Sequence, residues 1–214
     1  MTHSLQDTAV RSVLQRLFAA ADADPAAGPA LAADATARQR AEALQDFYLP
    51  ISARGGELLY ALARAARPQT VVEFGTSFGI STLYLAAAIH DNGTGHVLTT
   101  ELSDHKTAAA RANLAHAGLD TVVTVLSGDA RDTLTDVPAP IGLVLLDGWK
   151  DLCLPVLRLL ESRLAAGALV VADDTTLPSM REYLDYVRDP ANGYVSVEFP
   201  VEDGMEISCR AARG

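Results

Sequence analysis

The feature that most constrains the fold of this chain is a series of short apolar runs that alternate with helical segments. Two of these runs, residues 141–146 and 168–172, contain no charged residue. A strand that is apolar on both faces must be covered on both faces, as parallel strands are in sheets flanked by helices. The alternation therefore predicts an α/β doubly wound fold, with a mostly parallel sheet and helices on both of its faces.

The individual elements follow from the same pattern. We expect strands at residues 70–74, 96–100, 121–126, 141–146 and 168–172, and helices at residues 57–66, 81–89, 104–117 and 152–164. Gly118 is expected at the position after the third of these helices ends. The sequence Ser179-Met180-Arg181-Glu182 has the pattern of a capping box and predicts one more helix. Residues 194–199 and 205–210 are expected to form an antiparallel hairpin around Glu202-Asp203-Gly204.

The first fifty residues read as helical and separate from the rest, so we interpret residues 1–50 as an N-terminal helical cap and residues 51–214 as the main domain. Helical spacing gives the first segment one apolar stripe, made of Val10, Val13, Leu14, Leu17 and Phe18. An Ala-rich stretch at residues 21–33 interrupts the helices, and a second helix is expected at about residues 34–48. The stripe should pack on the main domain or across a two-fold axis, and we favour a homodimer.

Charge, hydrophobicity and cysteine content limit the classes of partner and the compartment that this chain suits. The chain has 17 Lys+Arg against 27 Asp+Glu, a formal net charge of -10, which disfavours binding to nucleic acid or to an anionic membrane surface. No apolar stretch approaches the roughly 20 residues of a membrane span, and the N-terminus does not have the pattern of a signal peptide. The two cysteines, Cys153 and Cys209, lack a metal-binding spacing. We therefore expect a reduced, cytoplasmic protein.

Acidic residues lie at the ends of the predicted strands or after them, at the edge of the sheet where ligands of such folds bind. They are Glu73, Glu101, Asp129, Asp147, Asp173 and Asp174. The loop from Gly75 to Gly79 lacks the G-x-G-x-x-G spacing of a dinucleotide site and the lysine of a phosphate loop. A tight turn at Gly75 and a close backbone approach at Gly79 remain as its expected properties.

The acids suggest a ligand with three parts. Glu73, beside the glycine loop, would suit a positively charged group and repel a pyrophosphate. Glu101 can accept both hydroxyls of a ribose, and Asp129 can accept from an adenine amino group. Ribose, adenine and a cationic amino-acid tail together describe S-adenosylmethionine.

These motifs together resemble the class I S-adenosylmethionine-dependent O-methyltransferases, and most closely the small metal-dependent group of catechol and caffeoyl-CoA O-methyltransferases. The resemblance runs from about Ile51 to the C-terminus. It rests on Glu73-Phe74-Gly75-Thr76-Ser77-Phe78-Gly79-Ile80-Ser81, Glu101, Gly128-Asp129-Ala130, Asp147-Gly148-Trp149-Lys150 and Asp173-Asp174. It implies a Rossmann-like, seven-stranded sheet whose last strand is antiparallel.

The resemblance also implies roles for single residues. Ser81 would hold the carboxylate of the methionine part, Trp149 would form a wall beside the adenine or the substrate, and Lys150 and Asp147 would be catalytic, with Lys150 as the base. The full set of implied cofactor contacts is Glu73, Gly75, Thr76, Ser81, Glu101, Asp129, Ala130, Asp147 and Trp149.

A metal site is expected where Asp147 follows one strand and Asp173 and Asp174 follow the next. Neighbouring strands lie about 4.8 Å apart, so three carboxylates would meet there and need a cation, Mg²⁺ first, with Ca²⁺ or Mn²⁺ as alternatives. The resembled family usually has asparagine where this chain has Asp174. The extra charge should hold the metal more tightly and weaken its effect on a bound hydroxyl. Beside a cation, burial should depress the pKa of Lys150 so that it can act as a base.

The predicted function is S-adenosylmethionine-dependent methyl transfer to a hydroxyl of a small, catechol-like aromatic molecule, assisted by a divalent metal and a lysine. The alternative within the class is a metal-independent methyltransferase that acts on a nitrogen or a lone hydroxyl. From other classes, a nucleotide-binding oxidoreductase and a non-catalytic S-adenosylmethionine-binding module fit the same fold.

Overall fold

A seven-stranded sheet forms the centre of the protein. The computed structural model describes residues 3–32, 34–201 and 203–211, and within them the strand order is β3-β2-β1-β4-β5-β7-β6. Strands β1 to β5 are parallel, and β7 runs antiparallel to both β5 and β6. The strands are β1 Thr70–Phe74, β2 His96–Glu101, β3 Val123–Ser127, β4 Ile141–Leu146, β5 Leu164–Ala172, β6 Tyr194–Phe199 and β7 Met205–Arg210. The predicted fold class is confirmed.

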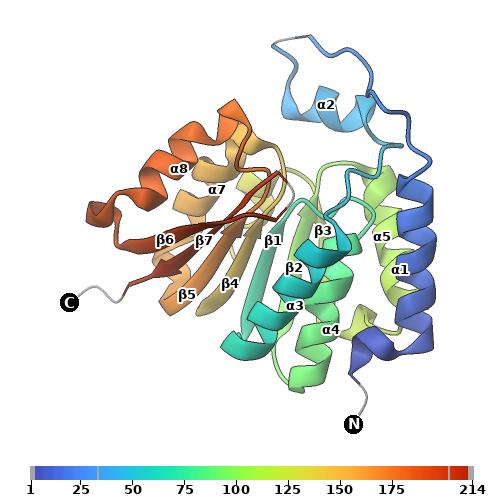
Figure 1. The fold of residues 1–214 in the computed structure, drawn as a ribbon, viewed down its shortest axis with the longest axis horizontal. Helices are drawn as coiled ribbons and strands as arrows, with labels where there is room; N and C mark the ends of the chain where they lie inside the picture. Colours follow the sequence, from blue (N-terminus) through green and yellow to red (C-terminus); the bar gives the residue numbers. More distant parts are fainter. Residues whose placement is uncertain (1–2, 33, 202, 212–214) are drawn as a thin grey trace.

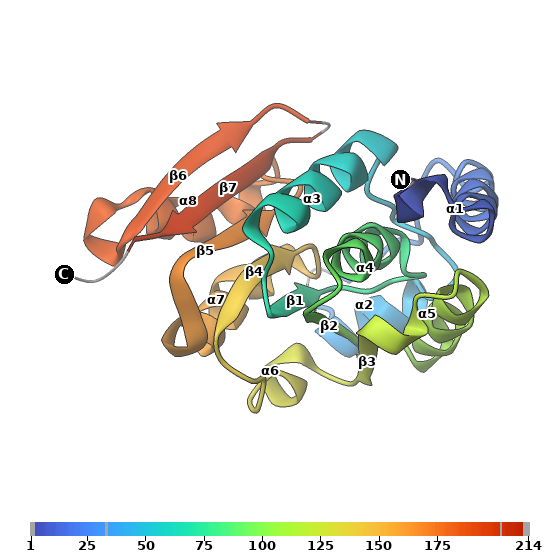
Figure 2. The ribbon, with the colours of Figure 1, turned by 90° about the horizontal axis from the view of Figure 1, so that it is seen from below.

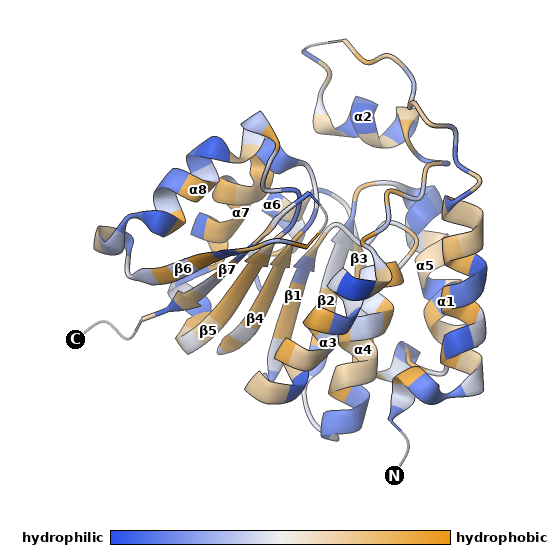
Figure 3. Cartoon of the chain, viewed as in Figure 1, coloured by the Kyte–Doolittle hydropathy of each residue, from blue (hydrophilic) through white to orange (hydrophobic). Residues whose placement is uncertain are grey.

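Helices cover both faces of this sheet. Figure 2 shows α3 and α4 on one side and α6 and α7 on the other. The helices are α1 Thr8–Ala21, α2 Ala37–Ala43, α3 Ala53–Ala66, α4 Ile80–Asn92, α5 Asp104–His116, α6 Ala130–Thr133, α7 Cys153–Leu160 and α8 Arg181–Arg188. The central strands β4 and β5 are hydrophobic along most of their length (Figure 3), because both of their faces are covered.

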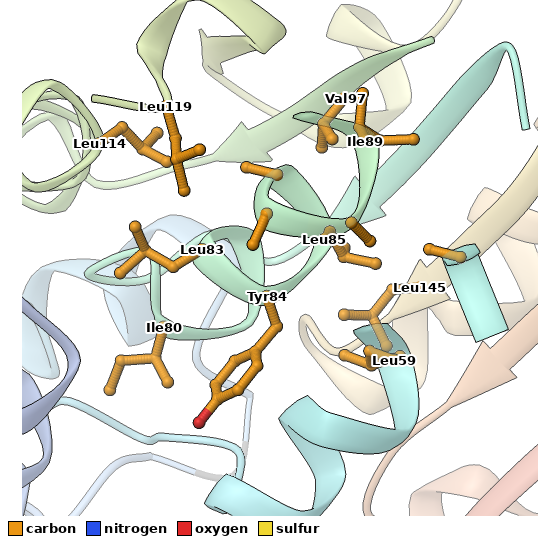
Figure 4. Close-up of a cluster of buried hydrophobic side chains, with 14 of the residues drawn as sticks. Leu59, Ile80, Leu83, Tyr84, Leu85, Ile89, Val97, Leu114, Leu119 and Leu145 are labelled. Atoms are coloured by element: carbon orange, nitrogen blue, oxygen red, sulfur yellow. The ribbon is translucent and has the colours of Figure 1, made fainter. Parts of the chain in front are cut away.

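Successive side chains of a strand point to opposite faces of the sheet, so they pack in two different hydrophobic cores. Val71 of β1 belongs to the core under α3 and α4, and its neighbour Val72 to the core under α7. In the first core, Tyr84 of α4 extends toward α3 (Figure 4). It meets α3 at Gly56, where an added Cβ would lie 2.3 Å from ring atoms of Tyr84. This glycine lets the two helices pack closely.

The apolar stripe of the first helix is buried within the chain. Val10, Val13, Leu14 and Leu17 of α1 are buried, and α1 contacts α4 and α5. Of the two predicted placements, packing on the main domain is the one observed. The stripe therefore gives no argument for a homodimer. The oligomeric state and the division into a cap at residues 1–50 and a domain at residues 51–214 stay predictions.

Several predicted boundaries were wrong. The second helix spans only Ala37–Ala43, and the predicted helix at residues 152–164 ends at Leu160, followed by a 3₁₀ turn and then β5 from Leu164. The predicted capping box does not form: Pro178–Met180 makes a 3₁₀ turn, and α8 starts after Met180 without a side-chain cap. Local pattern alone does not locate where one element turns into the next. Glu202 of the predicted hairpin turn and Ala33 of the Ala-rich stretch lie outside the described residues.

Gly118, predicted just after α5, has a φ of 69° and lies beyond the C-cap Ala117, so that prediction is confirmed. Cys153 and Cys209 are free thiols. Across the described ranges, no helix has both the length and the apolar character needed to pass through a membrane.

Candidate functional site

A cavity of about 440 Å³ opens at the carboxyl ends of the strands. It lies beside β1 and β4, where the strand order reverses, which is the usual place for a ligand in an open α/β sheet. The volume is within the usual range for a small-molecule site, about 300–1,000 Å³. The N-terminal segment contributes part of the wall through Ala37, Ala41, Leu44 and Tyr48.

The predicted site residues converge on this cavity. Those that line it are Gly75, Thr76, Ser81, Glu101, Asp129, Ala130, Asp147, Trp149, Lys150, Asp173 and Asp174. Glu73 is the predicted site residue that does not line it. The tertiary structure therefore brings together strand ends that are far apart in the sequence.

Gly75 permits a close approach of two loops in the cavity wall. Its φ is 103°, and an added Cβ would lie 2.8 Å from backbone atoms of Asp147 and Gly148. The close backbone approach was predicted at Gly79, and this was wrong: a Cβ at Gly79 would meet only Ala110, at 3.5 Å. Gly79 is required instead for its φ of 90°, as the N-cap of α4.

Glu73 lies beneath the glycine loop, fully buried. Its carboxylate accepts hydrogen bonds from Ser81 Oγ at 2.6 Å and from Thr82 Oγ1 at 2.5 Å. Burial raises the pKa of Glu73 to about 7, although these hydrogen bonds oppose the shift. Glu73 thus connects β1 to the first turn of α4, and the predicted contact with a cationic ligand stays a prediction.

Glu101 organises the loop above it while facing the cavity. Oε2 accepts from the backbone N–H of Ser77 at 2.8 Å, and Oε1 accepts from the backbone N–H of Ser103 at 2.9 Å. Each carboxylate oxygen has a second lone pair. Glu101 can therefore accept two hydroxyl groups of a ligand without releasing the loop.

Asp129 has a partner that the sequence analysis missed. Arg131 donates to it from Nε at 2.9 Å and from Nη2 at 2.7 Å, and the Arg131 backbone N–H caps the same carboxylate at 2.9 Å. These hydrogen bonds hold the pKa of Asp129 below its usual value. An adenine amino group would have to share these oxygens, whereas the adjacent Ala130 offers a buried apolar wall.

The three predicted metal ligands do lie together. Leu146 of β4 pairs with Ala172 of β5, which brings one carboxylate oxygen each of Asp147, Asp173 and Asp174 within 4.8 Å of one another. Burial, with Asp147 and Asp174 nearby, raises the pKa of Asp173 to about 8. Asp174 has a φ of 55°, a left-handed conformation that Asp and Asn tolerate better than most residues. Such a donor set suits a hard divalent cation.

Lys150 lies in the same corner. Its Nζ is 2.9 Å from Asp147 Oδ1 and 3.0 Å from Asp174 Oδ2. Burial lowers the pKa of Lys150, but the two carboxylates outweigh it and the net shift is upward. The two carboxylates that pair with the ammonium group are among the predicted metal ligands. The lowered pKa of Lys150 was predicted for a site with a cation beside it, and it stays a prediction.

Two further residues carried no recognisable signal in the sequence: one contacts a residue of the cavity wall and one lines the cavity itself. Arg40 of α2 stacks on Trp149, with its Cζ 4.7 Å from the ring centroid. Lys106 of α5 lines the cavity, is only 5% exposed and has its Nζ 5.5 Å from the ring centroid of Phe78. Burial lowers its pKa. Both contacts join segments distant in sequence, so no local motif could have revealed them.

Comparison with known proteins gives consistent matches. Residues 72–175 match a family described as a methyltransferase domain. Catechol O-methyltransferase B of Danio rerio is 30% identical over 72% of this chain and 62% of its own length. Catechol O-methyltransferase of Mycobacterium tuberculosis is 35% identical over 68% of this chain and 64% of its own.

Among solved structures, cofactor-bound Rv0187 from MTB superposes with a TM-score of 0.73 at 25% identity, covering 94% of this chain and 91% of that one. The chain spans roughly half to two thirds of the length of the first curated relatives it matches.

Proposed function

Because the chain belongs to the class I S-adenosylmethionine-dependent O-methyltransferases, in the group that includes the catechol and caffeoyl-CoA enzymes, we propose that it transfers a methyl group from S-adenosylmethionine to a hydroxyl of a small aromatic molecule. The observation that carries the proposal is the convergence of Glu101, the Gly75 loop and the Asp147–Asp173–Asp174 corner on one cavity.

The cofactor contacts follow from this arrangement. Glu101 is proposed to accept the ribose hydroxyls through its free lone pairs. Thr76 and Ser81 line the cavity next to Gly75, and Ser81 is proposed to hold the carboxylate of the methionine part. Ser81 Oγ donates to Glu73, so its remaining means of binding that carboxylate is its backbone N–H, at the start of α4.

The acidic corner fits a divalent cation, and we propose Mg²⁺, with Ca²⁺ or Mn²⁺ as alternatives. Asp147, Asp173 and Asp174 offer oxygen ligands, and the raised pKa of Asp173 reflects burial and repulsion that a bound cation would relieve. When bound, the ion supplies several kcal/mol of electrostatic stabilisation to a developing oxyanion.

Lys150 is proposed as the residue that takes the proton of the substrate hydroxyl. A phenol has a pKa of about 10, so it is mostly protonated near neutral pH. Lys150 can accept a proton only in its neutral form, and its pairing with Asp147 and Asp174 opposes that form. The two carboxylates therefore decide both where Lys150 lies and when it is able to act.

The rim of the cavity favours an aromatic substrate. Leu49 and Leu177 line it and remain 53% and 44% exposed, so they offer apolar surface that a bound ring would cover. A planar, catechol-like ring would contact these apolar walls while its hydroxyls face the acidic corner. A metal-independent methyltransferase acting on a nitrogen or a lone hydroxyl is the alternative.

Four broader predictions keep the status of proposals. They are the absence of a nucleic-acid partner, the absence of a membrane partner, a homodimeric state and a cytoplasmic location. The nucleotide-binding oxidoreductase is disfavoured by the methyltransferase matches, and a non-catalytic S-adenosylmethionine-binding module would be indicated by binding without turnover.

Turnover of a catechol substrate tests the proposal. Activity should need a divalent cation and disappear with chelator, and Asp147→Ala and Asp173→Ala should each lose most of the rate. Asp174→Asn should bind Mg²⁺ more weakly, measured by calorimetry, yet turn over faster at saturating Mg²⁺. Asp136→Ala, an exposed acid outside the cavity, is the control and should behave like the parent. Activity that is indifferent to chelator would favour the metal-independent alternative.

A further inference from the structure

Helix α2 lies over the cavity but is set apart from the rest of the fold. Figure 1 shows it at the top of the view, away from the sheet and the other helices. Three residues of this segment, Ala37, Ala41 and Leu44, line the cavity. The helix has only seven residues and a capping box between Thr36 and Gln39. A helix this short is not stable alone, so contacts with the body must hold it in place.

Arg40 supplies the charged contact of this kind. Its Nη1 and Nη2 donate to the two carboxylate oxygens of Asp151, both at 2.9 Å. The same guanidinium stacks on the ring of Trp149. The hydrogen bonds from Arg40 lower the pKa of Asp151. Arg40 of α2 thus contacts two residues that follow β4, Trp149 and Asp151.

The geometry of this contact is stronger than that of an ordinary surface ion pair. A bidentate guanidinium–carboxylate pair is directional, and stacking on an indole adds a cation–π attraction. The Arg40 side chain is 23% exposed, whereas that of Asp151 is 50% exposed, so solvent screens part of the charge attraction. The contact is therefore strong enough to hold a short helix and weak enough to open.

The contact also limits what Trp149 can do. Arg40 covers one face of the indole, and Trp149 lines the cavity. A ligand can then contact Trp149 only through its opposite face or its edge. Releasing Arg40 would free both the covering helix and this aromatic wall at the same time.

We propose that Arg40 is a latch: it holds α2 closed over the cavity, positions Trp149, and must release before a ligand enters or leaves. The identity of the ligand, S-adenosylmethionine or its product S-adenosylhomocysteine, rests on the proposed function. The latch itself rests on the contacts of Arg40 with Asp151 and Trp149.

Tryptophan fluorescence can report the opening of α2, because Trp149 is the one tryptophan of the sequence. In ligand-free protein, Arg40→Ala should make Trp149 fluorescence more accessible to acrylamide. Asp151→Asn should do the same, because loss of the bidentate pair releases Arg40 from the loop, although Asp151 itself does not stack on Trp149. Arg40→Lys keeps the charge but cannot form the bidentate pair, so it should resemble Arg40→Ala. Arg38→Ala, an exposed arginine of the same helix, should match the parent.

Stopped-flow fluorescence with S-adenosylhomocysteine then measures the gate. Arg40→Ala should release the ligand about tenfold faster, as expected when a charge-assisted pair and a stacked contact are lost. Association should also be faster, so the dissociation constant should change less than either rate. The double variant Arg40→Ala/Asp151→Asn should be no faster than Arg40→Ala, since both remove one interaction.

The outcomes separate the two proposals. If S-adenosylhomocysteine does not bind the parent, the proposed function fails, and acrylamide quenching still decides the latch. Quenching and release rates of Arg40→Ala equal to those of Arg38→Ala would overturn the latch. A weaker affinity that comes only from faster release, with unchanged association, would also overturn it, because Arg40 would then stabilise the complex without gating entry.

Discussion

At the scale of single residues, the carboxylates around the cavity differ because their neighbours differ. Glu73 is buried against two hydroxyls, Asp129 is paired with an arginine, and Asp147 shares Lys150 with Asp174. Glu101 instead accepts from two backbone N–H groups and faces the cavity. Residue type alone would make these acids equivalent, whereas their different hydrogen-bond and ion-pair partners distinguish their roles.

Glu101→Ala should weaken S-adenosylhomocysteine binding at least tenfold, because hydrogen bonds to a charged group are worth about 1.5–3 kcal/mol each. Isothermal titration calorimetry on folded protein measures the affinity. Glu101→Gln is the matched variant: it keeps one acceptor oxygen and should lose less. Unchanged affinity in Glu101→Ala would remove Glu101 from the cofactor site.

Glu73 should make stability depend on pH. Its folded pKa, about 7, lies above its ordinary value of 4.5, so between these values the folded state holds the proton more tightly than the unfolded state. The stability that Glu73 contributes is therefore complete below about pH 4.5 and lost as pH rises to about 7, by about 3 kcal/mol in all.

Urea unfolding at several pH values measures this dependence. Glu73→Gln carries no titratable proton, so its stability should fall less than that of the parent between pH 4.5 and 7. Thr82 can rotate its hydroxyl to accept from the new amide, which keeps the site paired. Parallel stability curves for the two proteins over this range would contradict the assignment.

At the scale of elements, close packing of α3 on α4 fixes one wall of the main core. An added Cβ at Gly56 would overlap the ring of Tyr84, and both helices contact the sheet. Periodicity predicted these helices, but it could not predict which faces meet. That depends on a contact between residues of two different helices.

Gly56→Ala should destabilise the protein by about 1–3 kcal/mol, because the new methyl group overlaps the Tyr84 ring and forces it or a helix to move. Alanine favours helix more than glycine does, which offsets part of the loss. Urea unfolding gives the free energy. Glu57→Ala, exposed on the same helix, should change stability little. A stabilised Gly56→Ala protein would show that the two helices can separate at small cost.

At the scale of the whole molecule, the cavity draws its wall from the N-terminal segment and from the carboxyl ends of β1 to β5. Ligand binding should therefore stabilise the fold as a unit. With S-adenosylhomocysteine at 100 times its dissociation constant, the gain is about 2.7 kcal/mol, or a rise in Tm of about 5–10 °C for a chain of this size. Mg²⁺ should add a further rise that chelator reverses.

Differential scanning calorimetry with and without each ligand measures these shifts. A rise with S-adenosylhomocysteine but none with Mg²⁺ would separate the cofactor site from the metal site. Light scattering at micromolar concentration measures the mass in the same samples. A monomer would contradict the predicted homodimer and would agree with the burial of the α1 stripe within one chain.

The sequence by itself determined the sheet class, the positions of most strands and the acids that follow them. Apolar runs and alternation act locally, and because β1 to β5 are parallel their carboxyl ends lie at one edge of the sheet. Hence the sequence alone predicts that Asp147, Asp173 and Asp174 meet.

Only the tertiary structure decided what those residues touch. Lys150 between Asp147 and Asp174, Arg131 on Asp129 and Arg40 on Trp149 are side-chain contacts. Their geometry depends on rotamers and on the placement of α2, which packs with few contacts to the sheet. The upward shift of the Lys150 pKa follows from its pairing with these two carboxylates. A pKa follows the charges within a few ångströms, and that distribution of charge is a property of the folded chain.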